Sequence, residues 1–129
     1  MRTLLPEGWP RPKGYANGIE AQGRMVFVAG MIGWDETGAF PDESFAGQVR
    51  RTLENTLAVL KEAGAGPEHM VRQTWYVTDK AEYLASVREI GAVWRELMGK
   101  HYPAMAVVQV TALMEDAAKV EIETTAVVG

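Results

Sequence analysis

The fold is decided by two segments, Tyr102-Pro103-Ala104-Met105-Ala106-Val107-Val108-Gln109-Val110 and the later Val120-Glu121-Ile122-Glu123. Both are rich in β-branched and small apolar residues, a composition typical of buried strands. Pro103 blocks any helix from continuing into the first segment. Because side chains alternate along a strand, the valine and isoleucine of the second segment point to one face and its two glutamates to the other. We therefore expect a sheet with one buried face and one face that carries carboxylates.

Length and composition indicate one domain that spans residues 1–129. The chain is 47% hydrophobic and 23% charged, which is typical of a soluble globular protein. It contains no cysteine, which excludes disulfides, thiolate metal sites and a cysteine nucleophile. No apolar run approaches the roughly 18 to 20 residues that span a bilayer, and we expect a cytoplasmic protein with no membrane partner.

Charge and histidine spacing exclude two further classes of function. The net charge of −4 and the scattered basic residues disfavour a nucleic-acid partner, since such partners bind basic patches. His69 and His101 are far apart and lack the spacing of metal ligands. We predict no metal site.

The first 30 residues predict an arm and a hairpin. Residues 1–14 contain three prolines and two glycines and should form an irregular arm with at most a short edge strand. Residues 15–21 and 24–29 are β-rich and are separated by Gln22-Gly23, which predicts a hairpin. The continuous apolar run of residues 25–28 indicates a strand that is covered on both faces.

Two amphipathic helices and three more strands follow. Apolar residues recur at helical spacing from Ser44 until Gly64, and a second helix should begin at Asp79, with Glu82 completing a capping box, and end at Gly99. Strands are expected at 71–78, 104–111 and 118–128. The order ββαβαββ predicts an α+β domain with two helices on one face of a mixed six-stranded sheet.

The aromatic residues divide by position. Residues 30–43 form a long loop that could be either the wall of a site or a cover over the core, and Trp34 on this loop is a candidate ligand contact. Trp75, on a strand, and Trp94, on a helix, are expected in the core.

Several short motifs, in order and at family-like spacing, give the chain a resemblance to a known family. The matching segments are Gly14-Tyr15, Val26-Phe27-Val28-Ala29-Gly30, residues 55–64, residues 74–79, Pro103-Ala104 and Val120-Glu121-Ile122-Glu123. Together they resemble the RidA (reactive intermediate deaminase A) family over nearly the whole chain. The resemblance implies a chorismate-mutase-like fold and a homotrimer with clefts between subunits. It also implies hydrolysis of a reactive enamine or imine to a carbonyl product and ammonia, without a cofactor.

The same resemblance implies roles for particular residues. Glu121 matches the family position that orients the attacking water and is the expected catalytic residue. Tyr15 matches the tyrosine at the cleft edge, and backbone groups at Ala104 could contact a carboxylate. Met105 stands where the family usually has an arginine, which would bind a substrate carboxylate through two charge-assisted hydrogen bonds.

Departures from the family pattern make the expected cleft more apolar. Ala29 and Met31 replace residues that are usually polar, and a thioether at Met105 offers only polarizable surface. We therefore predict that Met31, Trp34 and Met105 contact a larger, flatter or less charged substrate, such as the unsaturated amino acid 2-aminomuconate. Two alternatives stay open: a non-catalytic trimer that binds a small molecule, and a chaperone-like or interaction protein.

A further possibility is that another cation replaces the missing arginine. The candidates are Arg24, Arg72 and Lys100.

Overall fold

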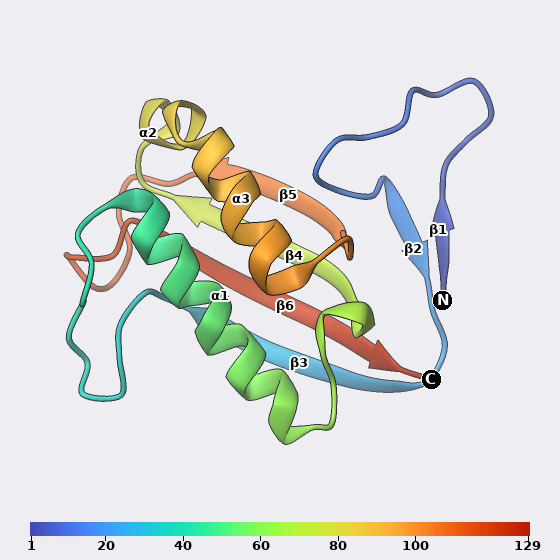
Figure 1. Cartoon of the computed structure of the whole chain (residues 1–129), viewed down its shortest axis with the longest axis horizontal. Coiled ribbons are helices and arrows are strands. Elements are labelled where there is room, and N and C mark those ends of the chain that lie inside the picture. The colour runs from blue at the N-terminus through green and yellow to red at the C-terminus, as the bar shows by residue number, and fades with distance from the viewer.

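Four strands form the main sheet, in the order β3-β6-β4-β5, in a computed structural model that describes all 129 residues (Figure 1). They are β3 (Arg24–Met31), β4 (Met70–Val77), β5 (Ala104–Gln109) and β6 (Val120–Val128). The central strand β6 runs antiparallel to both β3 and β4, whereas β5 runs parallel to β4. A parallel pair needs a long crossover, and the helical segment between β4 and β5 provides it.

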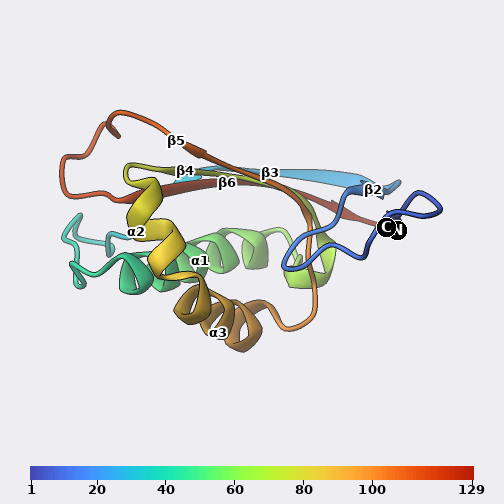
Figure 2. The same ribbon diagram turned by 90° about the horizontal axis from the view of Figure 1, so that it is seen from above.

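The helices cover one face of this sheet, as the view along the sheet shows (Figure 2). Helix α1 (Phe45–Glu62) begins where the Ser44 hydroxyl accepts a hydrogen bond from the backbone N–H of Gly47. Its residues Val49, Leu53 and Leu60 are fully buried against the sheet. The predicted first helix is therefore confirmed, including its buried stripe.

The predicted second helix is interrupted once. Asp79 caps its start by accepting from the N–H of Glu82 at 3.1 Å, as expected. The backbone then leaves helical geometry at Ser86, which separates α2 (Lys80–Ala85) from α3 (Val87–Met98). Serine competes for local backbone hydrogen bonds and is a common residue at such a break. A short 3-10 helix, η1 (Pro67–His69), precedes β4.

The core lies between the helices and the inner face of the sheet. Val120 and Ile122 of β6 are 0% exposed, which confirms the predicted direction of these side chains. Gln73 is also buried; its amide donates to Thr124 Oγ1 at 3.2 Å and its carbonyl accepts from Trp75 Nε1 at 2.9 Å. A buried polar group with such partners avoids the cost of an unsatisfied one.

The predicted six-stranded sheet and the predicted hairpin are wrong. Strands β1 (Arg2–Leu4) and β2 (Gly18–Glu20) form a separate antiparallel two-stranded sheet, which also carries an exposed ion pair of 3.0 Å between Arg2 and Glu20. Gly23 has a φ of 148° and leaves no room for a side chain beside the Val128 carbonyl. The chain therefore takes a glycine-specific bend against the end of β6, and this bend directs β2 toward β1 instead of toward β3.

The outer face of the sheet has no helix over it (Figure 2). Phe27 of β3 is 70% exposed there, and Met25 and Val108 are also exposed, whereas Val28 points inward and is buried. Within one chain, β3 is thus covered on one face only, contrary to the expectation from its continuous apolar run. None of the helices has the length and apolar character needed to cross a membrane.

Candidate functional site

A cavity of about 490 Å³ lies between α3, β5 and the N-terminal arm. Its volume is within the range of small-molecule sites, roughly 300 to 1,000 Å³. The lining residues are mostly apolar and aromatic: Lys13, Gly14, Tyr15, Trp75, Tyr83, Val87, Ile90, Gly91, Trp94, Arg95, Tyr102, Met105 and Val107. Tyr15 and Met105, both predicted from the sequence, therefore share one cavity.

Backbone pairing brings these two residues together. The arm is fastened to β5 where the N–H of Ala16 donates to the carbonyl of Pro103 at 2.9 Å, next to a parallel bridge between Ala16 and Ala104. Met105 pairs with Gln73, whose side chain faces the helices, so Met105 also faces the helices. Ala104 points to the other face and is not part of the cavity lining.

Four aromatic rings form a continuous series beneath the cavity. Trp75 makes an edge contact with Tyr83 at 6.4 Å between centroids and a tilted contact with Trp94 at the same separation, and Trp94 stacks on Tyr102 at 5.9 Å. These separations are those of favourable aromatic pairs. Trp75 and Trp94 are core residues, as predicted, and they also supply the cavity floor.

The two indole N–H groups of this floor are already engaged. Trp94 Nε1 donates to the carbonyl of His101 at 3.1 Å, and Trp75 Nε1 donates to Gln73. Burial raises the pKa of Tyr83, so that its hydroxyl stays protonated. The floor therefore presents uncharged aromatic rings to a ligand.

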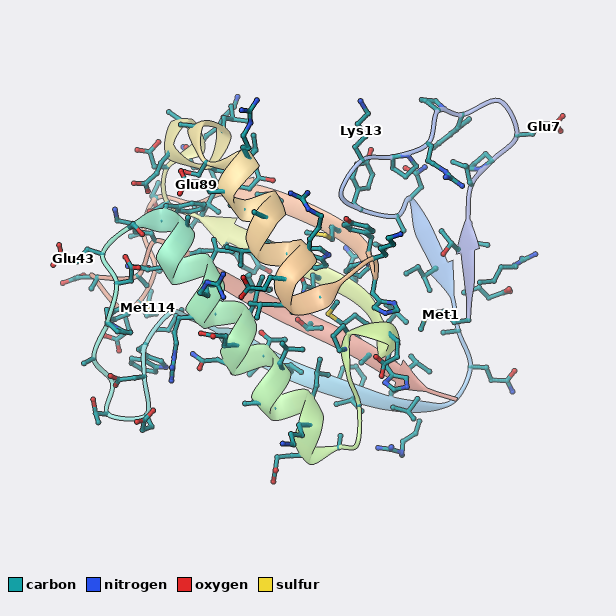
Figure 3. All side chains as sticks on the ribbon, viewed as in Figure 1. Met1, Glu7, Lys13, Glu43, Glu89 and Met114 are labelled. Atoms are coloured by element: carbon teal, nitrogen blue, oxygen red, sulfur yellow. The ribbon has the colours of Figure 1, made fainter.

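Two cations lie at the edge of the cavity, and neither was expected there from the sequence. Arg95 is on α3, and Lys13 projects from the stretch of the arm beside that helix (Figure 3). Neither takes part in any of the five ion pairs of the chain. The sequence does contain a hint of Arg95: it follows Gly91 by four residues, so the two positions lie on one side of the predicted helix.

The cations named from the sequence lie elsewhere. Arg24 donates to the carbonyl of Ala63 at 2.9 Å, and Arg72 lies on the outer face of the sheet beside Phe27 and Glu123. Lys100 is exposed and is not part of the cavity lining.

Glu121 lies on the outer face, against Gly30. A β-carbon on Gly30 would be 2.3 Å from Glu121 Oε2, so the absence of a side chain at position 30 makes room for this carboxylate. Glu121 pairs with Tyr76 of β4, and the Tyr76 hydroxyl donates to Glu123 Oε1 at 2.7 Å. This hydrogen bond, together with partial desolvation and the two carboxylates, raises the pKa of Tyr76.

Glu121 and Met105 do not meet within one chain. Met105 pairs with Gln73 and Glu121 with Tyr76, three positions further along β4. Strand geometry gives a separation of about 10 Å across the strands and about 10 Å along them. The two side chains also point to opposite faces, so one small molecule cannot contact both in a single subunit.

Met31 and Trp34 are apart from the cavity. Met31 is partly buried and packs against the core cluster. Trp34 is 38% exposed and lies 6.3 Å from Phe40 between ring centroids. The Trp34 carbonyl accepts from Asn55 Nδ2 at 2.9 Å and from Arg51 Nε at 3.3 Å, which fastens this part of the loop to α1.

The rest of the loop is ordered by its own hydrogen bonds. Asp35 accepts from the Thr37 hydroxyl at 2.6 Å and from the N–H groups of Thr37 and Ala39. These hydrogen bonds lower the pKa of Asp35. Nowhere in the chain do three histidine or carboxylate side chains converge as metal ligands would.

Comparison with known proteins gives a consistent set of relatives. The family model described as Endoribonuclease L-PSP matches residues 10–128. A RutC family protein of Pyrococcus abyssi is 34% identical over 116 residues, 88% of this chain and 87% of its own. The 2-iminobutanoate/2-iminopropanoate deaminase of Salmonella typhimurium is 32% identical over 131 residues, 98% of this chain and 97% of its own.

Solved structures show the same fold. The Rid protein YyfB of Yersinia pestis has a TM-score of 0.87 at 28% identity and covers 98% of each chain. Escherichia coli TdcF with bound serine has a TM-score of 0.70 at 30% identity and covers 100% of each chain.

Proposed function

This chain belongs to the RidA family, whose family model is described as Endoribonuclease L-PSP, and we propose that it hydrolyses a reactive imine or enamine. An enamine is first protonated on carbon to an iminium ion. Water then adds to the C=N carbon, a proton moves to nitrogen, and ammonia leaves as the carbonyl forms. These steps need an oriented water, a group that moves protons, and a surface that holds the substrate.

The observation that carries the proposal is the position of the Glu121 carboxylate against Gly30. The carboxylate is only partly exposed and lies on a strand, so its position is fixed by the sheet. A carboxylate in such a position can accept a proton from water as water attacks, and can return it to the departing nitrogen. Glu121 is the proposed catalytic residue.

We infer that the complete site lies between two copies of the chain. The cavity with Tyr15 and Met105 opens beside the arm, whereas Glu121 lies on the opposite face, and a second copy can bring the two surfaces together. The exposed apolar side chains Met25, Phe27 and Val108 support burial of the outer face in such an assembly. A homotrimer with three intersubunit clefts is the arrangement that we propose.

The proposed substrate range differs from that of small 2-imino acids. The Salmonella relative is named as a deaminase of 2-iminobutanoate and 2-iminopropanoate, and the TdcF structure contains serine, so both act on or bind small molecules. This chain has Met105 where the family usually has an arginine, and aromatic residues line the cavity around it. A larger or flatter compound than these imino acids fits these changes, and the unsaturated amino acid 2-aminomuconate is one example.

Ammonia release tests the activity. The assay would generate imines in situ from a panel of amino acids, add 2-aminomuconate separately, and compare the rate with and without protein. We expect Glu121→Gln to lower the rate by about 10²- to 10⁴-fold, the contribution of a general acid or base. Glu123→Gln is the matched control, because this carboxylate is on the same strand and face but binds Tyr76.

Two results would reject the proposal. Hydrolysis of no compound in the panel would reject the activity, and a Glu121→Gln rate equal to that of the wild type would reject the mechanism.

A second candidate is a trimer that binds a small molecule without catalysis. Met105 favours it, because the charge-assisted contact to a carboxylate is lost at this position. Binding of the same compounds with no ammonia release would support this candidate over the hydrolase.

A further inference from the structure

Building on the proposed imine hydrolase, we propose that Arg95 anchors the substrate carboxylate in place of an arginine at position 105, and that the substrate carries an aromatic side chain. The substrate class is then the imines of aromatic 2-amino acids. The anchor has moved from β5 to the facing helix α3, on the other side of the same cavity.

The apolar lining selects the side chain of the substrate. Tyr83, Trp75, Trp94 and Tyr102 form the series of rings, and both indole N–H groups are bonded within the protein. A ligand therefore gains ring contacts and burial of apolar surface there, but no hydrogen bond from the tryptophans. An aromatic side chain uses this surface, whereas a methyl or ethyl group uses little of it.

The size of the cavity leads to the same class. At about 490 Å³ it is far larger than a three- or four-carbon imino acid requires. Such a small ligand would leave the ring surfaces in contact with water. A phenyl or indole group would displace that water and gain the hydrophobic contribution.

Arg95 is suited to the carboxylate for three reasons. It is exposed at the edge of the cavity and has no acidic partner. Gly91, one turn earlier, has no side chain, and a β-carbon there would meet only Arg95 Nη1, at 3.5 Å. The guanidinium can therefore be approached from the cavity, and its planar donors match a carboxylate in two-pronged geometry.

Lys13 is the competing cation. It offers a single flexible point charge from an irregular arm, whereas Arg95 is carried by a helix whose residues Ile90 and Trp94 are buried in the core. The rigid element can hold the anchor at a fixed distance from the aromatic floor. Lys13 is thus the alternative that the experiment must exclude.

Calorimetric binding of three matched probes tests the inference. 3-Phenylpropanoate has both the ring and the carboxylate, 3-phenylpropanamide lacks the charge, and propanoate lacks the ring. For the wild type we expect 3-phenylpropanoate to bind at least tenfold more tightly than either other probe, since each lacks one of the two contributions.

Variants identify the cation that binds the carboxylate of the probe. Arg95→Gln should weaken 3-phenylpropanoate binding about tenfold, to the level of the amide, and leave amide binding unchanged. Arg88→Gln, an exposed arginine of the same helix that does not line the cavity, should bind as the wild type does. Arg95→Gln combined with Met105→Arg should restore carboxylate binding, because the charge returns to the same cavity from β5.

Several outcomes would overturn the inference: equal binding of propanoate and 3-phenylpropanoate, no effect of Arg95→Gln, or a loss caused by Lys13→Gln instead. Failure of the proposed hydrolase activity can be distinguished from failure of the Arg95 anchor. If 3-phenylpropanoate binds through Arg95 but no imine releases ammonia, the hydrolase is rejected and the anchor stands. If imines are hydrolysed and Arg95→Gln leaves KM unchanged, the anchor is rejected and the hydrolase stands.

Discussion

The two faces of the sheet use aromatic residues and charges in opposite ways. On the inner face, the rings of Trp75 and Trp94 are buried, and their polar atoms are bonded within the chain. On the outer face, Phe27 is exposed, and Glu121 lies with Glu123 and Tyr76 on an uncovered surface. One chain can therefore complete a binding cavity by itself, but it leaves the proposed catalytic carboxylate on a surface that a second copy would have to cover.

Removal of a ring from the inner face should have the largest effect. Trp75→Ala should lower the free energy of unfolding by about 3 to 5 kcal/mol, because it deletes a fully buried ring and leaves a cavity. Chemical denaturation measures this change. Phe27→Ala is the outer-face control and, at a protein concentration too low for self-association, should change the stability much less. Equal losses for the two variants under that condition would contradict the distinction between the faces.

Displacement of the Glu121 carboxylate on the outer face should have the next largest effect, which is a lower reaction rate. The new methyl group of Gly30→Ala would collide with the end of the flexible Glu121 side chain, so the carboxylate moves while the sheet is kept. We expect kcat to fall about 100-fold with little change in Tm. Gly18→Ala, where the new methyl makes an ordinary contact of 3.5 Å with Leu4, is the control and should keep its rate.

A charge on the outer face should weaken self-association. Phe27→Glu removes a phenyl ring whose burial in the proposed interface would contribute about 1.5 to 3 kcal/mol per subunit to the free energy of association. It also adds a third carboxylate to a face that already carries two. Light scattering across a dilution series should show a trimer for the wild type. The variant should dissociate at protein concentrations at which the wild type is still a trimer. A wild-type protein that is monomeric at every concentration would contradict the intersubunit site.

The smallest effect is expected for the outer-face hydrogen bond between Tyr76 and Glu123. The raised pKa of Tyr76 in the folded state stabilises the protein below the unfolded pKa of tyrosine, near 10, and this contribution is lost as the pH rises through the folded pKa. Tyr76→Phe should therefore be slightly less stable than the wild type at neutral pH. The difference should shrink above about pH 10, and unfolding curves at both pH values measure it.

Local patterns predicted the regular elements well where one face of an element is buried by its own chain. The stripe of α1 through Val49 and Leu53 was confirmed, as was the alternation of Val120 and Ile122 with the glutamates. The hairpin prediction failed at Gln22-Gly23, because the conformation of Gly23 is set by its contact with Val128, more than 100 residues away. No local pattern contains that contact.

The candidate site was predicted only in part, for a related reason. Tyr15 and Met105 do lie together, but Met31 packs against the core and Trp34 is outside the cavity. Arg95 was missed because its relevance depends on the tertiary arrangement that places α3, β5 and the N-terminal arm around one cavity.

The family, the two-layer α+β class and the absence of an arginine at position 105 could be predicted from the sequence, because these depend on residue identity and on short periodic patterns. The pairing of the strands, the aromatic rings that line the cavity and the cations at its edge follow from the tertiary structure. It also separated Glu121 from Met105, since side-chain direction in a sheet follows from strand register, and register is fixed by contacts between distant segments.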